Sequence, residues 1–203
     1  MSVTFDASIL LPLLFPGVKG PIDPATKKPI EHCRERIDQL VIDLEKSHTK
    51  VIIPTPALSE ILVYADNAGP KYLEQLHQSR AFKIEPFDER AAAEVAMMIR
   101  SDLKKLGQKR GRQVQDTWAK VKFDRQIVAI AKVNGASIVY SDDRGVRAFA
   151  EESGISVFGI ADLPLPGSMS QMGLFAPREQ DVIEVVQPFA RKFRVKDEEE
   201  KPD

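Results

Sequence analysis

Four carboxylates in this chain have the types and positions needed for metal-assisted chemistry. Asp6 and Asp142 come directly after apolar, β-branched runs that are typical of buried strands. Glu60 and Asp124 lie in segments whose apolar residues repeat at helical spacing. If the four side chains converge, they offer hard oxygen ligands that suit Mg²⁺ or Mn²⁺. A metal held in this way lowers the pKa of a bound water and neutralises charge on a phosphodiester.

Each carboxylate also has a simpler explanation, which stays open at the level of sequence. An Asp after a strand can cap the next helix, and we expect Asp143 to do this. Glu60 lies in a helix with apolar residues on almost every face, so we expect its carboxylate to lose hydration and to need a cation, a hydrogen-bond network or a raised pKa. A salt bridge or a narrow exposed strip would serve equally well. Asp124 could pair with a nearby Lys or Arg.

The elements that must position these residues alternate between strand and helix. We predict strands at 3–5, 51–53, 81–85, 137–140 and 155–158. We predict helices at 7–14, 30–46, 55–66, 71–77, 88–107, 117–133 and 146–152. This alternation favours an α/β domain with a mainly parallel sheet. In such a sheet ligands collect beyond the carboxyl ends of the strands, where Asp6 and Asp142 stand.

Composition predicts one domain in a reducing compartment. The chain has 203 residues, of which 43% are hydrophobic and 29% charged, and its net charge is −1. We predict a domain at 1–166, with a loop insertion at 16–29, and a partly disordered C-terminal extension at 167–203. The single cysteine excludes an internal disulfide, and no run is long and apolar enough for a membrane span. We therefore expect a cytoplasmic protein with no membrane contact.

The segments around the four acids resemble those of PIN-domain proteins, the class that includes VapC-type toxin ribonucleases. The matching stretches are VTFDAS at 3–8, IPTPALSE at 53–60, FDRQIVAIA at 123–131 and GASIVYSDD at 135–143. No single stretch is specific, but the ordered set of four is a fairly strong match, and the resemblance spans residues 3–164. The resemblance implies a three-layer α/β/α fold with a mainly parallel central sheet.

The same resemblance implies the roles of the residues. Asp6, Glu60, Asp124 and Asp142 would form an acidic quartet that holds one or two Mg²⁺ or Mn²⁺ ions. Ser8 and Ser141 would support it. The family often has Thr two residues before its last acid, where this chain has Tyr140, and an alignment shifted by one makes Asp143 the fourth acid. We prefer Asp142, with Asp143 as the second choice for a metal ligand.

The function that the resemblance implies is a metal-dependent endoribonuclease, with the toxin of a type II toxin–antitoxin pair as its biological role. It also implies an RNA substrate, a small antitoxin partner and a homodimer. A basic stretch fits an RNA substrate, since cations there outnumber acids and could contact phosphates without selecting sequence. Its predicted RNA-binding residues are Lys109, Arg110, Arg112, Lys120, Lys122 and Arg125. A solvated helix face would give the same pattern.

Two other functions compete with the nuclease. One is a catalytically inactive PIN-fold module that binds RNA or acts as a scaffold, against which the intact quartet argues. The other is a Mg²⁺-dependent phosphatase on an α/β sheet. Such an enzyme needs a nucleophilic Asp with a second Asp two residues on, and Ser8 occupies that position after Asp6.

Overall fold

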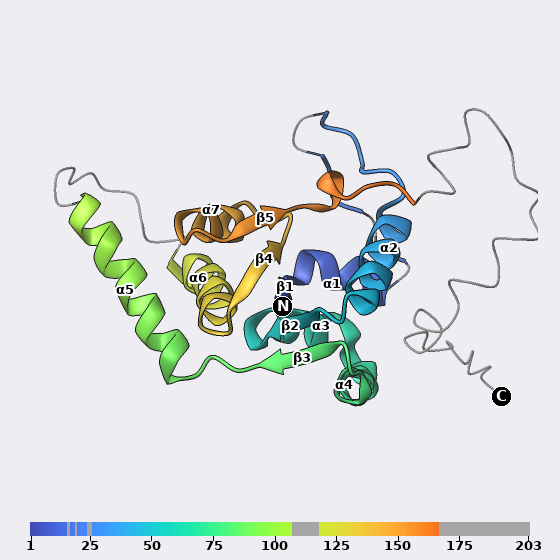
Figure 1. Cartoon of the computed structure of the whole chain (residues 1–203), viewed down its shortest axis with the longest axis horizontal. Coiled ribbons are helices and arrows are strands. Elements are labelled where there is room, and N and C mark those ends of the chain that lie inside the picture. Colours follow the sequence, from blue (N-terminus) through green and yellow to red (C-terminus); the bar gives the residue numbers. More distant parts are fainter. Residues whose placement is uncertain (16, 19, 24–25, 107–117, 167–203) are drawn as a thin grey trace, which may run out of the picture.

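A parallel sheet of five strands forms the centre of the protein (Figure 1). The computed structural model describes residues 1–15, 17–18, 20–23, 26–106 and 118–166, with the backbone alone for 102–106 and 118–122. Within them the strands are β1 (Ser2–Phe5), β2 (Lys50–Pro54), β3 (Phe82–Glu85), β4 (Ala136–Tyr140) and β5 (Ser156–Phe158). Their order is β3-β2-β1-β4-β5, and every neighbouring pair is parallel. The predicted α/β architecture is confirmed.

Helices cover both faces of this sheet. They are α1 (Ala7–Leu14), α2 (Cys33–Lys46), α3 (Thr55–Ala65), α4 (Gly69–Gln78), α5 (Glu89–Leu106), α6 (Trp118–Val133) and α7 (Arg144–Glu152), with short 3-10 helices η1 (Asp66–Ala68) and η2 (Ile160–Asp162). Crossovers between parallel strands are right-handed as a rule, and with this strand order the rule places the helices that lead toward β3 and those that lead toward β5 on opposite faces. Accordingly α1 contacts α2 and α3, whereas α6 contacts α5 and α7 (Figure 1).

The central strand β1 is anchored by its aromatic residue. Phe5 is fully buried, and its ring meets those of Phe82 and Tyr140 edge-on, with centroids 6.3 and 5.5 Å apart. Edge-on aromatic pairs add to the free energy gained from burial. Phe5 also pairs in register with Tyr140 of β4. This packing fixes the height at which β1 ends and therefore the position of Asp6.

The element boundaries differ from the predicted ones at three helix starts. Helix α2 begins at Cys33, after His32 in a left-handed conformation, rather than at residue 30. Helix α4 includes Gly69 and Pro70, which we expected to end the preceding helix, because Pro is tolerated in a first turn. Helix α7 begins at Arg144, two residues early, because the Asp143 side chain caps it.

Two predicted regions lie partly or wholly outside the described residues. Of the predicted loop insertion at 16–29, the described part includes an isolated antiparallel bridge between Ile22 and Pro29. The predicted C-terminal extension at 167–203 lies outside the described residues. Among the helices that the structure does describe, none combines the length and apolarity needed to cross a bilayer.

Candidate active site

The site lies where the strand order reverses. From β1 the chain steps to β2 and β3 on one side, while β4 and β5 lie on the other. Ligands of open parallel sheets bind at such a point, beyond the carboxyl ends of the strands. Asp6 follows the end of β1, and its backbone N–H donates to the Tyr140 carbonyl at the end of β4, at 3.1 Å. Asp6 and residues 141–143 therefore share this edge of the sheet.

Two serines tie the ends of β1 and β4 together around Asp6. Ser141 Oγ donates to Asp6 Oδ2 at 2.7 Å, and Ser8 Oγ donates to the same oxygen at 3.0 Å. Each hydroxyl also accepts a backbone N–H at 3.0 Å, Ser8 from Asp142 and Ser141 from Asp143. The supporting positions predicted for Ser8 and Ser141 are therefore occupied by side chains that orient the Asp6 carboxylate.

Asp6 is a buried carboxylate in an environment that disfavours its charge. Its side chain is 3% exposed, and among the described residues it forms no ion pair. Burial raises its pKa above the ordinary 3.8, hydrogen bonds from Ser141, the Ala7 backbone and Ser8 oppose the rise, and the charge of Asp143 adds to it. A bound cation would remove much of this penalty.

Asp143 and Asp124 meet at Gly145. The Asp143 side chain caps α7 by accepting the N–H groups of Gly145 at 2.7 Å and Val146 at 3.4 Å, as predicted for this residue. A Cβ built on Gly145 would lie 2.0 Å from Asp124 Oδ2 and 3.2 Å from Asp143 Oδ1. The two carboxylates therefore flank one point of the backbone, and Asp124 is buried as its place on an inward helix face predicted.

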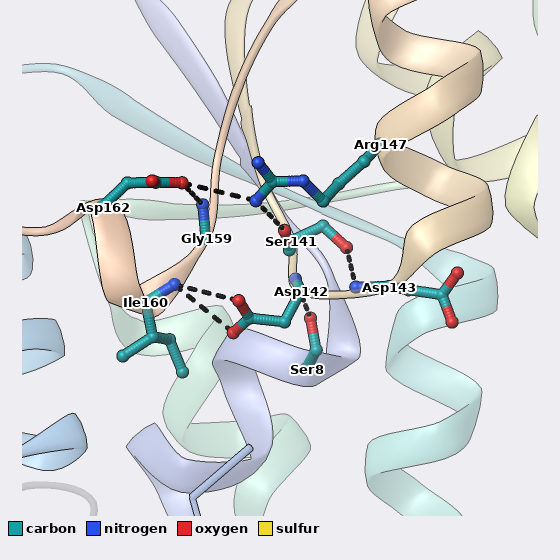
Figure 2. Close-up of polar contacts among 8 residues, drawn as sticks. All are labelled: Ser8, Ser141, Asp142, Asp143, Arg147, Gly159, Ile160 and Asp162. Atoms are coloured by element: carbon teal, nitrogen blue, oxygen red, sulfur yellow. Dashed lines mark hydrogen bonds and ion pairs between the residues drawn. The ribbon is translucent and has the colours of Figure 1, made fainter. Parts of the chain in front are cut away.

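Asp142 points the other way. Figure 2 shows its carboxylate beside Ile160, with Asp143 on the opposite side of the chain. Its two oxygens accept the Ile160 N–H at 3.1 and 3.3 Å. Burial raises the pKa of Asp142, while the Ile160 hydrogen bond and the nearby Arg147 lower it. The Asp142 side chain thus links η2 to the end of β4. This contact lies on the opposite side of the chain from Gly145.

Arg147 and Asp162 also hold η2 against the end of β4, and sequence reasoning did not identify either residue. Arg147 donates to the Ser141 carbonyl at 3.3 Å and pairs with Asp162 at 3.4 Å (Figure 2). Asp162 in turn accepts the Gly159 N–H at 2.7 Å. Gly145 was also missed, although a Gly two residues after a capping Asp could have indicated a close backbone approach.

Glu60 is exposed, which corrects the expectation that it is desolvated. It lies on the outer face of α3, because the buried residues of that helix are Pro56, Ala57, Leu58, Ile61 and Ala65. The structure therefore brings Asp6, Asp124 and Asp143 to one region and leaves Glu60 in solvent on a neighbouring helix. Within the described residues, no three acidic, His or Cys side chains form a complete set of metal ligands.

The predicted RNA-binding stretch is mostly outside what the structure describes. Lys109, Arg110 and Arg112 lie outside the described residues, and Lys120 and Lys122 are placed by their helical backbone only. Arg125 is described and does not fit the expectation. It is 8% exposed, and its guanidinium lies 4.6 Å from the centre of the Phe149 ring, so it packs between α6 and α7.

The burial of Asp6 predicts a pH dependence of stability in metal-free protein. The pKa of Asp6 is raised in the folded state, so the protonated form stabilises the fold. That contribution is complete below about 3.8 and is lost as pH rises through the raised pKa. Relative to Asp6→Asn, which stays neutral, the wild type should lose stability over this window with a slope approaching about 1.4 kcal/mol per pH unit. Urea unfolding of both proteins in EDTA at stepped pH measures the difference. Parallel curves would contradict the burial of a charged Asp6.

Comparison with known proteins supports the fold. No family model matches the sequence, and no curated protein matches it either. Among solved structures, the chain is similar to one in the complex described as VapBC2 from Rickettsia felis bound to a DNA fragment from their promoter. The likeness covers 78% of this chain and 98% of that one, with a TM-score of 0.50 and 12% sequence identity. Together with the parallel sheet, it confirms the expected PIN-like α/β/α fold.

Proposed function

We propose that this chain is a Mg²⁺- or Mn²⁺-dependent endoribonuclease of the PIN type. One observation carries the proposal: the buried Asp6 carboxylate at the strand switch point, with its charge opposed by burial and by Asp143. A protein retains such an arrangement at a cost in stability, and perturbed carboxylates in a crevice are typical of functional sites. The PIN-like fold and the resemblance around the acids supply the reaction class.

The residues present offer the kinds of ligand that a divalent cation needs, and a bound cation would have to draw their carboxylates together, since the described side chains do not form a complete ligand set. Asp6 and Asp143 come from the ends of β1 and β4 and Asp124 from α6, and all three offer hard oxygen ligands. The Gly145 backbone leaves room for Asp124 that any Cβ would fill. When bound, the cation supplies charge neutralisation at the phosphate and a more acidic water. In the chain itself, Ser8 and Ser141 hold one oxygen of Asp6 and so orient its carboxylate.

We assign the fourth acidic position to Asp143 rather than to Asp142, our first choice from the sequence. Asp142 is engaged with the Ile160 amide, whereas Asp143 shares with Asp124 the space around Gly145. Glu60 is retained as a ligand candidate, because it is an exposed carboxylate on α3, the helix that directly follows β2.

The toxin role and its partners are part of this proposal and rest on likeness alone. The similar solved structure is described as a VapBC2 complex on promoter DNA. By analogy, this chain would pair with a small antitoxin protein and form a homodimer. Co-expression with the product of an adjacent small gene, followed by size-exclusion chromatography, would show a stable complex if the analogy holds.

Cleavage of RNA by the purified chain tests the function. Single-stranded RNA should be cut internally with Mn²⁺ or Mg²⁺, and EDTA should abolish cutting until metal is restored. Asp6→Asn, purified in parallel, is the control for a contaminating nuclease. Equal cutting by both proteins would assign the activity to a contaminant. Metal-independent RNA binding without cutting would favour the inactive RNA-binding module instead.

A further inference from the structure

An exposed aromatic residue lies on the same helix face as Glu60. Tyr64 is 54% exposed and Val63 83% exposed, although both are large hydrophobic residues. Glu60 and Tyr64 are four residues apart on α3, so they lie one above the other at about 6 Å. Together with the exposed Ser59, they form a continuous outer stripe of α3.

The Tyr64 ring packs on one side against another aromatic ring of the protein. Phe15, at the end of α1, lies with its ring centre 4.7 Å from that of Tyr64, tilted by 58°. Phe15 is itself supported by the buried Tyr72 of α4, at 4.9 Å. The ring is thus supported on one side by a short aromatic stack that links three helices, while much of its surface remains open to solvent.

From this geometry we infer that Tyr64 is a stacking platform for an unpaired base of the RNA substrate, an inference that rests on the proposed function. Aromatic side chains stack on bases of single strands without selecting sequence. The stacked base would belong to a nucleotide near the phosphate held at the acidic site, with its ring on Tyr64 along the outer stripe of α3 that also carries Glu60.

The size and surroundings of the stripe favour a base over a second protein. A stable protein interface needs about 800 Å² from each partner, with an apolar centre. The two exposed apolar residues are instead flanked by Ser59 and Glu60 of α3 and by Asn67 of η1, which are polar or charged and exposed. One planar ring of this size matches one base. The substrate class that follows is single-stranded RNA with unstacked bases, rather than a regular duplex.

Binding measured apart from cleavage tests the platform. Fluorescence anisotropy in EDTA compares wild type, Tyr64→Ala and Tyr64→Phe on a labelled single-stranded RNA and on the same RNA with abasic sites. Tyr64→Ala should weaken binding of intact RNA about 5- to 100-fold, and Tyr64→Phe should restore it, since a phenyl ring stacks equally well. On abasic RNA the three proteins should bind alike. Met97→Ala, an exposed apolar residue on α5, is the matched control and should bind as wild type.

Several results would overturn the inference. Equal binding by wild type and Tyr64→Ala would remove the platform while leaving a nuclease, if cutting persists. A shift from dimer to monomer in sedimentation of Tyr64→Ala, with unchanged RNA affinity per protomer, would make the stripe a protein interface. Tyr64-dependent binding by a chain that never cuts RNA would keep the platform and remove the nuclease. No RNA binding by the wild type would remove both.

Discussion

Asp143→Asn should lower Mn²⁺-dependent RNA cleavage at least about 100-fold, whereas Asp142→Asn should remain close to wild type. Loss of a group that merely supports a metal ligand typically costs about 10- to 100-fold, so loss of a ligand should reach the upper end of this range or exceed it. Asp143 shares the space around Gly145 with Asp124, while Asp142 is turned to the Ile160 amide. Asp6→Asn and Asp124→Asn should match Asp143→Asn.

Asn is the informative replacement at both positions. At Asp143 it caps a helix as well as Asp does, so α7 should keep its start and the melting temperature should change little. At Asp142 an amide oxygen can still accept the Ile160 N–H. Initial rates at saturating Mn²⁺, beside the thermal midpoint of each variant, separate lost chemistry from lost structure. A large loss in Asp142→Asn with an active Asp143→Asn would return the fourth position to Asp142.

The sequence was enough to predict the sheet and the place of Asp6. The central strands β1 and β2 have short, β-branched or aromatic runs that suit burial on both faces, and β1 is buried from Val3 and β2 from Val51 onward. A strand of this kind must end at the sheet edge, so the acid that follows it has only one region to occupy. The same argument places residues 141–143 at that edge, because β4 is the neighbour of β1.

The sequence did not determine whether Asp142 or Asp143 occupies the fourth acidic position. Adjacent residues beyond a strand point in opposite directions, so a shift of one residue exchanges their roles. The contacts of the two side chains decide between them. Asp142 contacts Ile160, whereas Asp143 contacts the start of α7. The Ile160 contact joins residues 18 apart in the chain, and no local pattern reveals it.

Glu60 shows a different limit of sequence reasoning. Apolar residues surround it along the chain, and we took this as a sign of burial. In the structure Val63 and Tyr64 are exposed on the same stripe, so apolar residues in α3 do not all face the core. Hydrophobicity marks burial only on average, because a considerable part of every folded surface is apolar.

Gly145→Ala should both destabilise the protein and lower its cleavage rate about 100-fold. The new Cβ would lie 2.0 Å from Asp124 Oδ2, a distance that atoms do not tolerate, and Asp124 is buried and cannot swing into solvent. Overpacking of this kind costs about 1–3 kcal/mol. Ala in place of Gly within a helix gains only about 0.5–1 kcal/mol, so the overlap should win. Displacing a catalytic carboxylate by about 1 Å can cost about 100-fold in rate.

A double-mutant cycle isolates the contact between Gly145 and Asp124. Gly69→Ala is the matched control, since its Cβ would meet Leu62 Cδ2 at an ordinary 3.4 Å at the start of α4. In an Asp124→Ala background the overlapping oxygen is absent, so Gly145→Ala should become neutral or stabilising. The change of sign between the two backgrounds would locate the strain at this one contact. If Gly145→Ala is instead as stable and as active as Gly69→Ala, Asp124 does not lie against this backbone, and the shared space proposed for Asp124 and Asp143 does not exist.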